Sequence, residues 1–98
     1  MAYYVVLNFD IQDADRFQKY ERHVGATLPP AVKVLIFDDE KKDLEGQSRQ
    51  RLVVLEFETE AAALQWYASD AYQAVAEDRK SSTSGWVRGV APFSRKPR

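Results

Sequence analysis

Apolar residues gather in four short stretches of the chain, and these stretches predict four strands. The first, residues 3–9, is rich in β-branched and aromatic side chains and is apolar on both faces, as in a strand that is covered on both sides. Similar runs predict strands at 32–37, 52–57 and 86–90, the last interrupted by Gly89. We therefore expect a single sheet of four strands.

Between these strands the apolar residues recur at helical spacing. The first predicted helix begins after Asp13 as its N-cap and ends at the two prolines at positions 29 and 30, which cannot continue a helix. Its apolar face consists of Phe17, Tyr20, Val24 and Leu28.

The third strand is followed by two shorter helices. Thr59 can cap a helix that runs to Ala68, with Leu64 and Tyr67 on one face, and Ser69 can cap a second helix that runs to about Lys80. We expect loops at 38–50 and 81–85, and a polar, disordered tail at 94–98. A single domain would thus cover residues 1–93.

The order of these elements is β-α-β-β-α-β, which is the ferredoxin-like arrangement of α+β proteins. It predicts a four-stranded antiparallel sheet with the helices on one face. By alternation Val6, Val54 and Ile36 would lie on the other face, where a large exposed apolar patch usually marks an interface. We therefore predict a homodimer in which two sheets pack face to face as a dimeric α/β barrel.

Composition narrows the classes of partner. The chain has 98 residues, a formal net charge of −1 and no cysteine. Nucleic acid is disfavoured as the main partner because phosphate binding needs concentrated Lys and Arg, and disulfides and thiolate metal sites are excluded. No signal peptide or membrane-spanning segment is indicated, so we expect a cytoplasmic protein that needs no metal or other cofactor.

Several stretches resemble one family. Residues 51–57, RLVVLEF, are similar to the strand signature of the domain-of-unknown-function family 1330, and residues 66–73 resemble its Trp-Tyr-x-Ser-x-x-Tyr-Gln stretch, with Arg79 at the expected offset. Leu44-Glu45-Gly46 and the aromatic pair Phe17 and Tyr20 also match. The resemblance implies a bacterial protein of the dimeric α/β-barrel superfamily, whose members include cofactor-free monooxygenases, isomerases, dehydrochlorinases and haem enzymes.

The chain departs from the family pattern at two places. Asp70-Ala71 follow the serine where the family often has Pro-Glu, and residues 29–31, Pro-Pro-Ala, stand where a pair of glycines is usual. A Gly-Gly turn therefore cannot be assumed at the mouth of a pocket.

Glu56 and Arg79 are the candidate catalytic residues. A carboxylate enclosed by apolar walls suits a general acid or base, and a guanidinium on the inward face of a helix can clamp a substrate carboxylate. The structural alternative is that Glu56 pairs with Arg51 or Arg79 and fixes a helix to the sheet.

Five further residues are candidates for the ligand pocket. Each has a simpler structural explanation: aromatic rings on helices mostly pack in the core, and a serine before a helix is most simply an N-cap. The five are Trp66, Tyr72, Tyr20, Ser69 and Arg51.

These residues lead to one main hypothesis and three alternatives. The main one is a homodimer that binds a small organic molecule, an aromatic or a short carboxylic acid, between the sheet and the second helical segment, with metal-free proton transfer as the chemistry. The alternatives are a non-catalytic interaction or regulatory module, a cofactor-free monooxygenase, and haem binding through His23, the single histidine.

Overall fold

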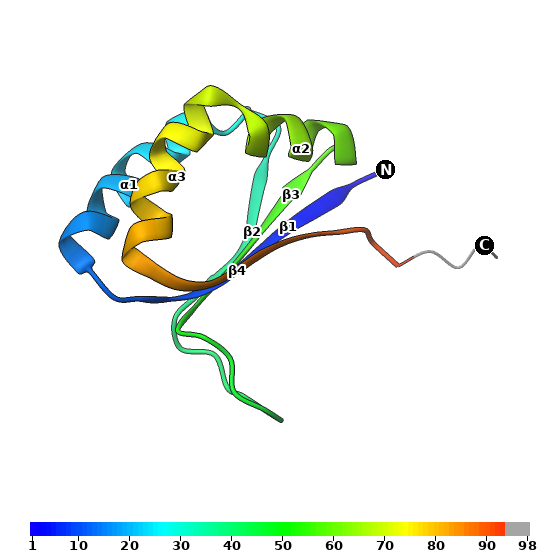
Figure 1. Cartoon of the computed structure of the whole chain (residues 1–98). Coiled ribbons are helices and arrows are strands. Elements are labelled where there is room, and N and C mark those ends of the chain that lie inside the picture. Colours follow the sequence, from blue (N-terminus) through cyan, green and yellow to red (C-terminus); the bar gives the residue numbers. More distant parts are fainter. Residues whose placement is uncertain (94–98) are drawn as a thin grey trace.

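The computed structural model describes residues 1–93, which form one sheet and three helices (Figure 1). The elements in chain order are β1 (Tyr3–Ile11), α1 (Ala14–Thr27), β2 (Lys33–Asp38), β3 (Arg51–Phe57), α2 (Glu60–Ala68), α3 (Asp70–Ser82) and β4 (Thr83–Val90). The predicted tail lies outside the described residues, and no described helix has the length and apolar character to cross a bilayer.

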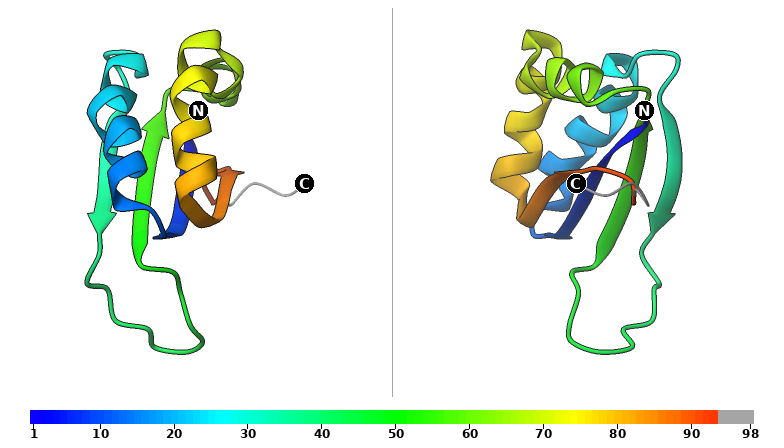
Figure 2. Two further views of the ribbon diagram at one scale, coloured as in Figure 1. Left: turned by 60° about the vertical axis from the view of Figure 1, so that its left-hand side comes forward. Right: turned by 90° about the vertical axis from the view of Figure 1, so that its right-hand side faces the viewer.

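The four strands form an antiparallel sheet in the order β2-β3-β1-β4. All three helices lie on one face of this sheet, with α1 and α3 side by side (Figure 2). This arrangement confirms the predicted α+β, ferredoxin-like fold. Because the structure holds one chain, the dimer stays a prediction.

The core lies between the helices and one face of the sheet. Alternation turns Val5, Leu7 and Phe9 of β1 toward the helices, together with Leu55 and Phe57 of β3. We call the opposite side the open face, because no described helix covers it (Figure 2). Its large apolar side chains are Tyr4, Val6, Ile36, Leu52, Val54, Trp86 and Val90. The predicted positions of Val6, Val54 and Ile36 are thus confirmed.

Local sequence signals fix the starts of the helices. The side chains of Asp13, Thr59 and Ser69 each accept a hydrogen bond from the backbone N–H three residues later, which supplies a donor of the first turn with a partner. All three predicted N-caps are confirmed. On α2, however, Leu64 is 55% exposed, and the buried residues are Ala63 and Trp66.

The loop predicted at 81–85 is wrong. Helix α3 continues to Ser82, whose hydroxyl donates to the carbonyl of Asp78, and β4 begins at Thr83 directly opposite Ile11. Gly85 is required here for close packing and not for a turn, because a Cβ at this position would clash with the carbonyl oxygen of Asn8.

Candidate ligand-binding site

A cavity of about 220 Å³ lies between α1 and the β2–β3 half of the sheet. Helix α1 and its C-cap residue contribute Phe17, Tyr20, Glu21, Val24, Gly25 and Leu28 to its wall. The strands contribute Leu7, Phe9, Val34, Phe37, Arg51, Val53 and Leu55. Gly25 is exposed at the edge of this space, and a Cβ added there would meet no atom of residues 1–93 within 4 Å outside the backbone of its own helix.

The polar end of the cavity is built around Arg51. Its guanidinium binds Asp39 with two hydrogen bonds, from Nε at 2.9 Å and from Nη2 at 3.0 Å, and its Nη1 donates to Glu21 at 2.7 Å. The same group lies 4.5 Å from the ring centre of Phe37 and 5.4 Å from that of Phe17. The hydrogen bonds from Arg51 lower the pKa of the Asp39 carboxyl. Arg51 thereby ties α1 to the β2–β3 loop.

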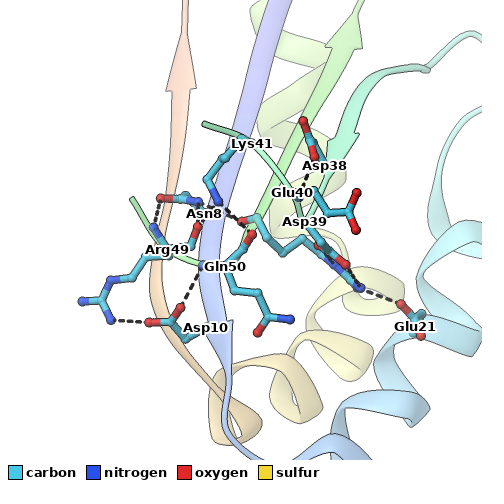
Figure 3. A network of polar contacts seen from close by, with 10 residues as sticks. Asn8, Asp10, Glu21, Asp38, Asp39, Glu40, Lys41, Arg49 and Gln50 are labelled. Atoms are coloured by element: carbon cyan, nitrogen blue, oxygen red, sulfur yellow. Dashed lines mark hydrogen bonds and ion pairs between the residues drawn. The ribbon is translucent and has the colours of Figure 1, made fainter. Parts of the chain in front are cut away.

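A second set of polar contacts holds the end of that loop on β1 (Figure 3). The side chain of Asn8 accepts from the N–H of Arg49 at 3.1 Å and donates to the carbonyl of Arg51 at 2.8 Å. Asp10 accepts from the N–H of Gln50 at 2.8 Å and from Nη1 of Arg49 at 3.0 Å, and the backbone hydrogen bond is the main reason its pKa is lowered. The backbone at Arg51 is therefore held in place.

Sequence reasoning missed this loop anchor. Asn8 is 3% exposed although it lies on the open face, because the loop covers it. The available signal was a polar residue inside a strand that is otherwise apolar, which usually marks a buried hydrogen-bonding group with a defined partner.

Arg79 is buried beside two tyrosines. It is 7% exposed, and its Nε lies 3.4 Å from the hydroxyl of Tyr72, which in turn shares a hydrogen bond of 3.3 Å with the hydroxyl of Tyr20. Among residues 1–93 no carboxylate lies within ion-pair distance of this guanidinium. Burial, and next the neighbouring Tyr72, raise the pKa of Tyr20 far above its usual value, so this phenol stays protonated at neutral pH.

Glu56 lies on the other side of the sheet from Arg79. Its neighbours in the strand, Leu55 and Phe57, point toward the helices, so the pleat turns Glu56 to the open face. There its carboxylate lies 3.9 Å from Nζ of Lys33, and within residues 1–93 it forms no ion pair with Arg51 or Arg79, the partners that the structural alternative named. The structure therefore does not bring the two candidate catalytic residues together, and their catalytic roles stay predictions.

Trp66 and Ser69 occupy structural positions. The indole packs against Phe57 and Tyr72, with ring centres 5.3 Å and 4.0 Å away, and its Nε1 donates to the hydroxyl of Thr27 at 3.0 Å. Ser69 caps α3 and donates to the carbonyl of Trp66 at 2.7 Å.

The cavity lies under α1 and not under the second helical segment, where we expected it. Of the five predicted pocket residues, Tyr20 and Arg51 line it, whereas Trp66, Tyr72 and Ser69 do not. A smaller cavity of about 140 Å³ lies between α2 and the strands β1 and β4. His23 is exposed on α1, where its Nδ1 donates to the carbonyl of Lys19 at 2.7 Å.

Comparison with known proteins places this geometry in context. The model of a family described as a domain of unknown function, DUF1330, matches residues 2–91. No curated protein matches the sequence at a significant level.

Several solved structures share the fold. A protein of unknown function from Rhodopseudomonas palustris has a TM-score of 0.77 at 13% identity, covering 95% of this chain and 83% of that one. A hypothetical protein of Arabidopsis thaliana has a TM-score of 0.67 at 15% identity, with coverages of 98% and 91%. SnoaB, a cofactor-independent oxygenase from Streptomyces nogalater, has a TM-score of 0.62 at 12% identity, with coverages of 99% and 98%. At these identities the likeness concerns the fold alone.

Proposed function

The chain belongs to the domain of unknown function family 1330, whose name assigns no activity, and we propose from the geometry that it is a homodimer that binds a small organic molecule beneath α1. The observation that carries the binding proposal is the cavity of about 220 Å³ with its almost wholly apolar wall. Val34 and Phe37 of its wall are more than half exposed, so the cavity opens to solvent on the β2 side. An apolar cavity of about 150 Å³ is known to hold benzene. A molecule of one or two rings matches the size found here.

The groups that reach the cavity favour binding over acid–base chemistry. The ring of Tyr20 lines the cavity, but its hydroxyl is hydrogen-bonded to Tyr72 outside the lining and burial raises its pKa, so it is a poor base at neutral pH. Arg51 already has two carboxylate partners. Glu56, the candidate general base, lies on the far side of the sheet, so proton transfer by Glu56 would require a separate site on the open face.

The open face supports the homodimer. Its central residues Val6, Val54 and Ile36 lie side by side on three adjacent strands and form an apolar surface that no helix of residues 1–93 covers. Lys33, Glu56 and Arg88 add positive and negative charges to the same face. A two-fold dimer brings this face against its own copy, so opposite charges of the two subunits can meet. A second sheet packed about 10 Å away would bury these side chains without covering the cavity on the helical side.

The binding proposal is tested by filling the cavity from two sides. The Gly25→Phe and Val53→Phe variants place a ring at the α1 wall and at the strand wall, and Gly25→Ala is the matched control. With 2-naphthol as the probe, followed by calorimetric titration, we expect binding to wild type and to the alanine variant and at least tenfold weaker binding to both phenylalanine variants. Binding that is equal in all four proteins, or absent from wild type, would reject the proposal.

The dimer is tested by light scattering after size-exclusion chromatography. We expect wild type to elute with twice the chain mass and Val54→Lys, at the centre of the open face, to elute as a monomer. Leu64→Lys is the control, because Leu64 is exposed on α2 and far from that face. A monomeric wild-type protein would refute the dimer.

A further inference from the structure

We infer that the cavity beneath α1 takes uncharged aromatic molecules and rejects carboxylates of the same size, because its one lining cation is already neutralised. This inference rests on the proposed binding function and adds the chemical class of the ligand. It also replaces the short carboxylic acid that the sequence left open as a ligand.

Arg51 is the single Lys or Arg among the described residues that line the cavity. Three of the five N–H groups of its guanidinium are used: two bind Asp39 and one binds Glu21. The group also lies over the rings of Phe17 and Phe37, which holds it in place between α1 and β2. A ligand anion would therefore have to displace a carboxylate that is already well bound.

Charge balance works against an anion. Glu21 lines the cavity and Asp39 lies directly behind Arg51, so one positive charge faces two negative ones. Lys41 is the further cation near Asp39, but its ammonium donates to the carbonyls of Arg49 and Gln50 and does not line the cavity. A carboxylate bound against this apolar wall would lose part of its hydration and would meet no unpaired cation among the described lining residues, which is unfavourable.

An uncharged ligand meets no such penalty. The rings of Phe9, Phe17, Tyr20 and Phe37 line the cavity and offer faces and edges to a flat molecule. Nη1 and Nη2 of Arg51 each retain one N–H, which can donate to a neutral hydroxyl or carbonyl oxygen without breaking the bonds to Asp39 and Glu21. The favoured ligand is thus an aromatic ring system with at most a neutral oxygen.

The test uses two probes of matched size, 2-naphthalenemethanol and 2-naphthoate, titrated calorimetrically at neutral pH. We expect the alcohol to bind wild type at least tenfold more tightly than the carboxylate. Equal or tighter binding of the carboxylate would overturn the charge selection and leave the binding function standing. Absence of binding by both probes would overturn the function and the inference together.

A pair of variants tests the cause. Glu21→Gln removes one of the two carboxylates and leaves the Asp39 pair intact, so we expect the preference for the alcohol to shrink severalfold. Glu77→Gln on α3 changes the net charge equally, but Glu77 is exposed and does not line the cavity, so the preference should not change. An unchanged preference in Glu21→Gln, or the same reduction in both variants, would contradict the role of the Arg51 cluster.

Discussion

The two halves of the helical layer differ in how they meet the same sheet. Under α2 and α3, the rings of Trp66, Tyr72 and Phe57 pack against one another with centres as close as 4.0 Å, and Tyr72 is fully buried. Under α1, the partly buried Val24 and the exposed Gly25 border a cavity of about 220 Å³.

This contrast shows which sequence feature marks the candidate site. The aromatic residues of the second half look like pocket walls in the sequence, yet their rings pack against one another, and the cavity beside α2 has only about 140 Å³. The space under α1 is larger, at about 220 Å³, and absent side-chain volume produces no sequence motif. The packed half should therefore account for stability and the hollow half for binding, and the predictions below test that division.

The largest difference should follow from truncating one side chain in each half. Trp66→Ala removes a buried indole and its hydrogen bond to Thr27, so we expect it to lower the free energy of unfolding by about 3–5 kcal/mol. Val24→Ala borders space that is already empty and should cost about 1 kcal/mol or less. Urea denaturation of both variants measures the difference, and equal losses would contradict the division.

A smaller effect is expected from the hydroxyl of Tyr72. Tyr72→Phe leaves the buried Nε of Arg79 and the hydroxyl of Tyr20 without a shared partner, so unfolding should become easier by about 1–3 kcal/mol. Tyr3→Phe is the matched control, because Tyr3 packs against the same core and its hydroxyl has no hydrogen-bond partner among residues 1–93, so its loss should be nearly neutral. Equal effects of the two variants would show that the Arg79 contact contributes nothing.

Much of the fold was predictable because its signals are local. Alternation located the strands, and the caps at Asp13, Thr59 and Ser69 located the helix starts. The loop predicted at 81–85 failed because Gly85 looks like a turn signal, whereas the residue is needed for close contact with the carbonyl of Asn8 across the sheet. The contact joins β4 to β1, so it can be recognised only when the pairing of these two strands is known.

The candidate site was less predictable because its parts are far apart in sequence. Arg51 meets Glu21 across 30 positions and Asp39 across 12, and neither partner forms a motif with it. The sequence correctly predicted that Glu56 shares a face of β3 with Leu52 and Val54. The helices, however, cover the opposite face of that strand. Strand alternation shows which residues share a face, and the packing of the helices determines which face is enclosed.

Tyr20 lies where the two halves meet, and it should make the free energy of unfolding fall at alkaline pH. Burial raises its pKa above the value of about 10 for an unfolded tyrosine, so above pH 10 the unfolded chain loses a proton that the folded chain keeps. Stability is unaffected below pH 10 and should fall by about 1 kcal/mol by pH 11. Tyr20→Phe should reduce this loss in urea titrations at pH 9 and 11, and an identical loss in both proteins would exclude Tyr20 as its source.

The smallest expected effect has the opposite sign and belongs to the hollow half. Gly25→Ala adds a methyl group that meets no atom within 4 Å, so it creates no clash and removes the conformational freedom of a helical glycine. We expect the free energy of unfolding to rise by about 0.5–1 kcal/mol, toward the lower value because Gly25 lies in the last turn of α1. Thermal unfolding measures the gain. Since the methyl group also leaves most of the cavity empty, affinity for 2-naphthol should be retained, and a loss of both stability and binding would show that this wall of the cavity is already filled.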